Sequence, residues 1–255
     1  MIISHQHRYL FIEIPLTGSW AIRKELCAHY DGMPILHKHA TYPEFQRTAE
    51  PAELDYFVFA AIRHPLDEIV SRYAKLMSDH KGIFSDRTRT QTLETDYSDH
   101  EKYKFVHESK ADFVTFFRKY HRRPFGDLID VASDQYDFII RYECLQEDFA
   151  EVLRRLKLEQ VRPVPVSNKT AGKRTDWHTY YTPEIRAQAY HVVAPYMKKW
   201  GYAFPADWER YPISWRSQLE FSLMTHLRNL YYTHLRYSRR PHAKAVRYLR
   251  AWLFD

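Results

Sequence analysis

Two histidines separated by one residue, His37 and His39, offer proton-transfer chemistry. Side chains at i and i+2 point the same way in an extended segment, so the two imidazoles would lie side by side. A hydroxyl group must lose its proton as it attacks, and an imidazole can accept that proton. The pattern therefore favours a general base with a neighbouring imidazole. A metal site is less favoured because no third ligand has convincing spacing. Two solvated histidines without a chemical role are the remaining interpretation.

A turn between a predicted strand and a predicted helix offers a second kind of chemistry, the binding of an anion. The segment from Phe11 to Trp20 reads as a strand, a tight turn and a helix start. Backbone N–H groups of such a turn point outward, and the helix dipole favours a phosphate there. The G-x-x-x-x-G-K-[ST] spacing of a Walker loop is absent. Taken alone, the same pattern also occurs as ordinary α/β structure.

Arg63 and Ser71 offer a second anion-binding pair. Arg63 directly follows an apolar run that reads as a buried strand, and ligands of open α/β sheets bind beyond the carboxyl ends of strands. Ser71 lies about two helical turns beyond Pro65, which is well placed as the first residue of a helix. A guanidinium and a hydroxyl brought together could hold a phosphate. The alternative is an arginine at a strand end and a serine on a helix face.

Alternating strands and helices must position these groups. Apolar runs predict buried strands at Tyr9–Ile14, Tyr56–Ile62 and Tyr136–Tyr142. Helical spacing or capping residues predict helices before residue 30, from Pro65, around 113–120, over 145–156 and from Thr182-Pro183. This alternation is typical of parallel βαβ units with a sheet covered on both faces, so we expect an α/β fold. Residues 78–110 have no sustained period over most of their length, and we expect a surface insertion on the substrate side.

The positive charge of the chain lies at its C-terminal end. Residues 214–255 carry eight basic and two acidic residues, which accounts for the whole net charge of +6. We expect a main domain at 1–213 and a basic amphipathic helical tail at 214–255, interrupted near Pro241. The tail would pack its apolar stripe on the main domain or bind an anionic polymer or membrane surface. That stripe comprises Leu219, Leu223, Leu227, Leu230, Tyr231 and Leu235.

Several protein classes are disfavoured by composition. The longest purely apolar run, Tyr56–Ile62, is far shorter than the roughly 20 residues that cross a bilayer. The N-terminal residues do not follow the pattern of a signal peptide. Cys27 and Cys144 have no partner motif, which suits a reducing compartment. We expect a cytoplasmic protein, with a peripheral position at the inner membrane surface as the alternative, and we expect no nucleic-acid partner.

Six short motifs, taken in order over about residues 8 to 204, resemble those of carbohydrate sulfotransferases that use 3′-phosphoadenosine 5′-phosphosulfate (PAPS). The group with the uronyl 2-O-sulfotransferases is the most similar. The motifs are Pro15-Leu16-Thr17-Gly18-Ser19, His37-Lys38-His39, Arg63-His64-Pro65 with Ser71, Arg141-Tyr142-Glu143, Asn168-Lys169-Thr170 and Trp200-Gly201-Tyr202.

The resemblance implies a P-loop-like three-layer fold with a central parallel sheet, a PAPS co-substrate, a glycan or glycolipid acceptor and no metal. His37 would take the proton from the acceptor hydroxyl, with His39 assisting. The residues implied to bind the 5′-phosphosulfate are Leu16, Thr17, Gly18, Ser19 and Trp20. Arg63 and Ser71 would bind the 3′-phosphate, and a loop would close over the nucleotide with Lys169, Lys173 and Arg174.

One departure from the family pattern bears on activity, because Leu16 stands where the family has a lysine. That lysine contacts the oxygen joining phosphate to sulfate, and loss of such a contact typically costs about 10²- to 10³-fold in rate. Lys38, Lys169 and Lys173 are candidates to replace it. Glu13 is a poor neighbour for a polyanion unless it is protonated, paired or pointed at the acceptor.

Three hypotheses follow. The first is an active carbohydrate sulfotransferase with a relocated cation. The second is a weak or inactive relative that still binds nucleotide or an anionic glycan. The third is another phosphate-handling α/β enzyme such as a kinase, which is disfavoured because neither a Walker lysine nor an acidic pair for Mg²⁺ is evident. The acceptor and the oligomeric state are left open.

Overall fold

The structure is a computed structural model that describes residues 1–86, 97–165, 172–174 and 176–236. The chain divides into two units, and each is built from separate stretches of sequence. Among the described residues, unit 1 comprises 1–63, 127–165 and 225–236, and unit 2 comprises 64–86, 97–126, 172–174 and 176–224. The two units are described separately below.

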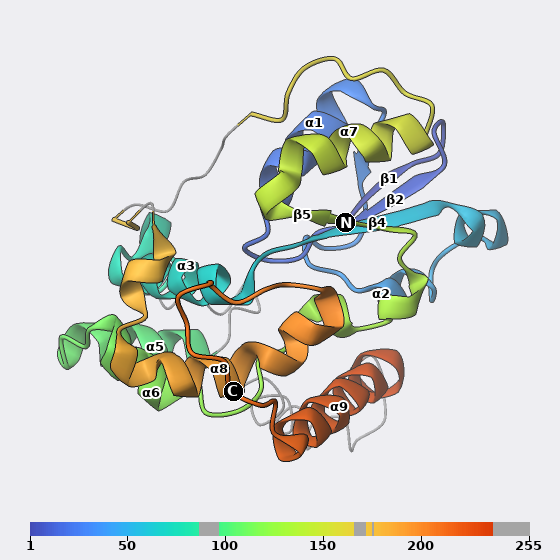
Figure 1. Ribbon diagram of the computed structural model, residues 1–255. Coiled ribbons are helices and arrows are strands. Elements are labelled where there is room, and N and C mark those ends of the chain that lie inside the picture. The colour runs from blue at the N-terminus through green and yellow to red at the C-terminus, as the bar shows by residue number, and fades with distance from the viewer. Residues whose placement is uncertain (87–96, 166–171, 175, 237–255) are drawn as a thin grey trace. The chain divides into compact units, whose positions relative to one another are not determined.

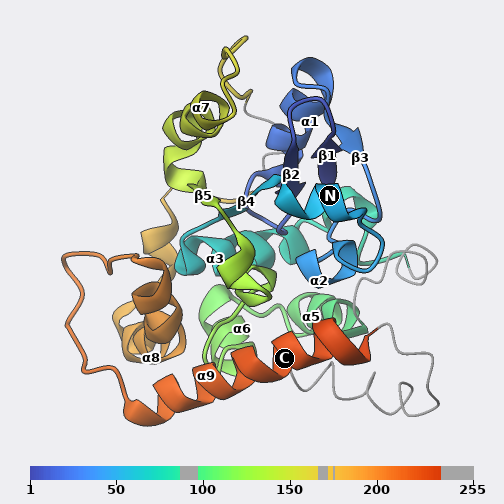
Figure 2. The same ribbon diagram turned by 90° about the vertical axis from the view of Figure 1, so that its right-hand side faces the viewer.

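Unit 1 is built on a mixed sheet of five strands in the order β3-β1-β2-β4-β5. The parallel core consists of the three strands predicted from the apolar runs, β2 (Tyr9–Ile12), β4 (Phe57–Ile62) and β5 (Phe138–Arg141). Two short antiparallel strands, β1 (Ile2–Ser4) and β3 (Met33–Pro34), complete the sheet, and Figure 2 shows β3 beside β1 at its edge. The predicted α/β class with a parallel sheet core is confirmed, and the antiparallel edge was not predicted.

Helices α1 (Ser19–His29) and α7 (Leu145–Arg155) cover one face of this sheet (Figure 1). Their buried side chains, among them Leu26 and Phe149, form one apolar cluster with Phe11 and Phe59 of the central strands. The alternate strand residues on the opposite face are buried too, and they include Leu10, Ile12, Val58, Ala60 and Ile62. Because both faces are buried, these strands read in sequence as continuous apolar runs rather than as alternating patterns.

Unit 2 is helical in its described part. It contains α3 (Pro65–Met77), α5 (Tyr97–Glu108), α6 (Phe113–Tyr120) and α8 (Pro183–Trp200). Part of the expected surface insertion at 78–110 belongs to its core, because Phe84 and Val106 are buried in the cluster that these helices share. The expectation of a purely surface segment was therefore wrong for these residues. Residues 87–96 of the insertion lie outside the described residues.

The predicted C-terminal tail begins with α9 (Trp215–Leu230), which Figure 2 shows as one long helix. It starts in unit 2 and ends in unit 1. Leu219, Leu223 and Leu230 of the predicted packing stripe are 40–60% exposed, so that prediction was wrong for this face. Phe221, Met224 and Arg228 are buried instead, whereas Tyr231 of the predicted stripe is buried as expected. The segment around Pro241 lies outside the described residues, and the predicted boundary at residue 213 stays a prediction.

The end of α9 is anchored to unit 1 by polar contacts. The Asn229 side-chain amide donates to the carbonyl of Asp130 (3.1 Å), and its Oδ1 accepts from the backbone N–H of Ala132 (2.7 Å). Asp130 lies in a short 3₁₀ turn, Leu128–Asp130, next to β4. A short α2 (Tyr42–Phe45) completes the regular helices described in unit 1.

Candidate functional site

The connection between β2 and α1 has the backbone geometry of an anion cradle. Leu16 and Gly18 both have left-handed φ angles, 65° and 79°, on either side of Thr17. The hydroxyls of Thr17 (2.9 Å) and Ser19 (2.8 Å) both donate to the carbonyl of Ile14, so they stabilise the shape of the loop. Alternating right- and left-handed residues turn successive N–H groups toward one point, which is the arrangement of anion-binding nests.

The N–H groups of this loop are available to a ligand. Within the described residues, no backbone acceptor pairs with the N–H groups of residues 17 to 20, and the first intrahelical bonds run from Ala21 and Ile22 to Gly18. The loop also lies at the positive end of α1. The predicted cofactor-loop residues 16 to 20 therefore form one continuous cradle with free donors.

Arg63 lies against this loop, a contact that was not predicted from the sequence. It directly follows β4, is 9% exposed, and donates from Nη1 to the carbonyl of Leu16 (3.0 Å). Its guanidinium carbon lies 4.1 Å from the ring centroid of Tyr142. Because parallel strands end at the same edge of the sheet, the ends of β2, β4 and β5 bring these three groups together.

Tyr142 contacts the loop, although sequence reasoning assigned it no role. It follows the end of β5, and its ring edge packs on Gly18 so closely that a Cβ there would lie 3.0 Å from Cδ2. The ring therefore contacts both the cradle and the Arg63 guanidinium. The available signal was its place at the end of the predicted strand Tyr136–Tyr142.

The two predicted histidines point in different directions. The N–H of Ala40 donates to the carbonyl of His37 (3.1 Å), so the segment is a turn and the extended geometry expected for it is wrong. The exposed His37 contacts Glu44 (Nε2 to Oε2, 2.9 Å), whereas the Nδ1 of His39 contacts the backbone carbonyl of Glu13 (2.8 Å). Burial lowers the pKa of His39 to about 4. His39 is therefore a neutral imidazole held beside the loop, with Nδ1–H as donor and Nε2 as the basic nitrogen.

Glu13, which precedes the loop, is fully buried and neutralised by pairing. Its Oε2 accepts from Nη1 of Arg23 (2.7 Å) and from the amino group of Met1 (2.8 Å). Both contacts go to Oε2, and Oε1 is buried without a hydrogen-bond partner among the described residues. This pairing removes the objection that a free carboxylate would repel a bound polyanion.

Three cations gather around Trp20 in the first turn of α1. The Nζ atoms of Lys38 and Lys24 lie 5.1 and 5.5 Å from a ring centroid of Trp20, and the guanidinium carbon of Arg23 lies 6.0 Å away. Lys38 was one of the candidates to replace the missing loop lysine. The fold thus places it at the start of the same helix, although it is distant in sequence.

The remaining predicted site residues belong to unit 2. Ser71 lies on α3 and is 1% exposed, and its hydroxyl has no partner among the described residues. Lys173 forms an ion pair with Asp67, and Arg174 lies over the ring of Tyr180 at 5.4 Å. Lys169 lies outside the described residues.

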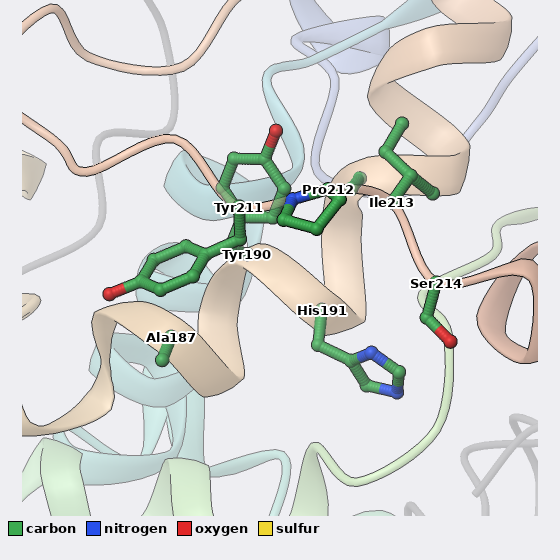
Figure 3. A pocket seen from close by; sticks show the side chains of 8 residues that line it. Ala187, Tyr190, His191, Tyr211, Pro212, Ile213 and Ser214 are labelled. Carbon is green, nitrogen blue, oxygen red and sulfur yellow. The ribbon is translucent and has the colours of Figure 1, made fainter.

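A pocket of about 300 Å³ in unit 2 does not fit a polyanion. Figure 3 shows α8 contributing Ala187, Tyr190 and His191, and the following segment contributing Tyr211 to Ser214. Neither a lysine nor an arginine lines it, and none of the predicted site residues does. Binding of a polyanion needs basic groups or free N–H groups, which the loop in unit 1 supplies.

Neither a metal-binding cluster nor a membrane-spanning helix occurs in the described part of the chain. No group of three metal-ligating side chains was found there. No described helix is both long and apolar enough to cross a membrane.

Comparison with known proteins identifies the family. A model of the sulfotransferase family matches residues 1–203, a span that includes the loop, both histidines, Arg63, Ser71 and Lys173. No curated protein and no solved structure matches the chain. Because the family match covers most of the sequence, the chain belongs to the sulfotransferase family.

Proposed function

We propose that the protein transfers a sulfuryl group from PAPS to a hydroxyl of a carbohydrate acceptor. One observation carries the proposal. The free N–H groups of residues 17–20 and Arg63 lie at the same loop, because the Arg63 guanidinium donates to the carbonyl of Leu16. Family membership supports sulfuryl transfer rather than phosphoryl transfer. The order of the short motifs supports PAPS and a carbohydrate as the two substrates.

The loop would hold the 5′-phosphosulfate with its backbone donors. These N–H groups are fixed before a ligand arrives, because the Thr17 and Ser19 hydroxyls and Arg63 already stabilise the loop. Fixed donors can stabilise the charge that develops on the leaving phosphate without reorganising during the reaction. A single donor of this kind is worth about 10²- to 10³-fold in rate.

In this proposal His39 takes the role of general base that the motif resemblance gave to His37. Its Nδ1–H is held by the Glu13 carbonyl, so Nε2 can accept the proton of an acceptor hydroxyl. The acceptor oxygen then forms its bond to sulfur while the bond between sulfur and the phosphate oxygen breaks, which leaves adenosine 3′,5′-bisphosphate. His37 is exposed and paired with Glu44, which makes it the less suitable base.

The roles of Arg63 and Ser71 at a 3′-phosphate, and those of Lys169, Lys173 and Arg174 over the nucleotide, stay predictions from the motif resemblance. The buried hydroxyl of Ser71 has a hydrogen-bonding capacity that no described residue satisfies. A bound phosphate oxygen would satisfy it.

Calorimetric titration with adenosine 3′,5′-bisphosphate and with ATP tests the proposal. We expect micromolar binding of the bisphosphate, weaker binding of ATP, and a loss of about tenfold or more in Arg63→Ala, because charge-assisted contacts of this kind are worth about 1.5–3 kcal/mol. Arg154→Ala is the matched control, since this exposed arginine on α7 is paired with Glu151. Equal affinity of Arg63→Ala and the wild type would contradict the assigned site.

Turnover with sulfur-labelled PAPS separates an active enzyme from a binding relative. We expect label transfer to an oligosaccharide, abolished in His39→Ala and largely kept in His37→Ala. Binding without transfer to a panel of neutral, carboxylated and sulfated oligosaccharides would refute the catalytic part of the proposal.

A further inference from the structure

Trp20 and the lysines around it form a surface cluster that the reaction described so far does not use. Trp20 is 37% exposed, and Lys24 and Lys38 reach its ring from the same helix and from the segment after β3. Arg23 also lies beside the ring, but its guanidinium is already paired with the buried Glu13. The two lysines add further positive charge beside the ring.

The arrangement would attract an anion. Lys24 has no carboxylate partner among the described residues, and the Nζ atoms of Lys24 and Lys38 lie 5.5 and 5.1 Å from a ring centroid of Trp20. A bound anion would be attracted by the field of these two ammonium groups. An exposed indole adds a flat apolar face that can pack against the C–H face of a sugar ring.

We propose that Trp20, Lys24 and Lys38 form a subsite for a negatively charged sugar of the acceptor, with the indole against the ring and the lysines against its carboxylate or sulfate. The inference rests on the proposed function, because it takes the acceptor to be a carbohydrate. It assigns acceptor selectivity to the first turn of α1. There the side chain of Trp20 is exposed, while the backbone N–H groups of the same loop would bind the donor.

The same positive cluster could instead serve the phosphosulfate of the donor, so the test separates the two anions. Calorimetry measures binding of two oligosaccharides of equal length, one of hyaluronan and one of chitin. Both contain N-acetylglucosamine, and only hyaluronan carries carboxylates. The variants are Trp20→Ala, Trp20→Phe, Lys24→Ser and the double variant Lys24→Ser/Lys38→Ser. Adenosine 3′,5′-bisphosphate is titrated into the wild type and Lys24→Ser.

The wild type should bind the hyaluronan oligosaccharide more tightly than the chitin one, with an advantage that shrinks at high salt. Trp20→Ala should weaken hyaluronan binding by about tenfold and Trp20→Phe by less, since a smaller ring retains part of the contact. The double lysine variant should remove the preference for hyaluronan, and Lys24→Ser should bind the bisphosphate within about twofold of the wild type because exposed single charges contribute little.

Matched controls exclude general effects of charge and of an exposed indole. Lys198→Ser/Lys199→Ser removes two exposed lysines from α8, and Trp215→Ala removes an indole that is 70% exposed on α9. Neither should change the preference. Equal binding of the two oligosaccharides by the wild type, or a loss of bisphosphate rather than hyaluronan binding in Lys24→Ser, would overturn the inference. Failure of the proposed function would show separately, as wild-type protein that does not bind the bisphosphate.

Discussion

The contact between Gly18 and Tyr142 makes a quantitative prediction about the loop. Gly18 has a φ of 79°, which costs an L-residue about 1–2 kcal/mol. In Gly18→Ala the new Cβ would also lie 3.0 and 3.2 Å from two carbons of the Tyr142 ring. The ring would have to move, and overpacking of this kind typically costs about 1–3 kcal/mol more. We expect a total loss of about 2–5 kcal/mol in the free energy of unfolding.

Gly82 is the internal control for the backbone part of this cost. It has a φ of 66°, but no described atom lies within 4 Å of the position of its Cβ. Gly82→Ala should therefore lose only about 1–2 kcal/mol, which is the cost of the left-handed conformation alone. The difference between the two variants isolates the clash with Tyr142.

Urea denaturation followed by circular dichroism measures both variants. Moving the Tyr142 ring should also disturb Arg63, which lies 4.1 Å from it, so Gly18→Ala should bind adenosine 3′,5′-bisphosphate less tightly while Gly82→Ala should not. In the background of Tyr142→Ala, Gly18→Ala should cost no more than Gly82→Ala, which gives a coupling energy of about 1–3 kcal/mol. Equal costs for Gly18→Ala in the presence and absence of the Tyr142 ring would refute the reasoning.

Two further predictions concern ionisable side chains in unit 1, His39 and Arg228. Burial lowers the folded-state pKa of His39 to about 4, so the unfolded chain binds a proton that the folded chain does not as the pH falls from about 6.5 to 4. The free energy of unfolding of the wild type, measured by urea denaturation, should fall over this pH window, and that of His39→Gln should fall less. The same pH dependence of this free energy in both proteins would contradict the assignment. Arg228 is 4% exposed and lies near Asp127 and Asp130, whose charges oppose the effect of burial on its pKa. Arg228→Met should cost about 3–5 kcal/mol, because it leaves buried carboxylates without that cation. The exposed Arg216→Met on the same helix should change stability by less than about 0.5 kcal/mol, and a similar cost for both variants would show that burial of Arg228 is unimportant.

The sequence predicted the parts of the fold that depend on local signals. The apolar runs at 9–14 and 56–62 correspond to β2 and β4, and Pro65 is the first residue of α3. A strand buried on both faces needs nearly every residue to be apolar, and proline suits the first turn of a helix, so both features are legible without tertiary contacts. The place of Arg63 immediately after a strand was sufficient to predict a site residue at that strand end, whereas its contact with Leu16 was not predicted.

Other features depended on contacts between residues distant in sequence. Strands β1 and β3 have three and two residues, too short to produce a periodic pattern, and they exist because neighbouring strands pair with them. The exposed leucines of α9 could not be told from its buried side, because Arg228 is buried there and Asn229 is partly buried with polar partners in unit 1. A polar residue is buried only when distant partners satisfy it, and helical periodicity contains no information about those partners.

The features of the candidate site also fall into those that the sequence predicted and those that only the tertiary structure revealed. Its residue types and their order along the chain were determined by the sequence alone, from the anion loop through the histidines to Arg63. The tertiary structure decided which groups lie together: it turned His37 outward and His39 toward Glu13, brought Lys38 to Trp20, and placed Tyr142 against both the loop and Arg63. The physical reason is that the residue at which a strand ends follows from the local sequence pattern. The orientation of a side chain in a turn depends instead on its hydrogen-bond or ring partners, which are distant in sequence.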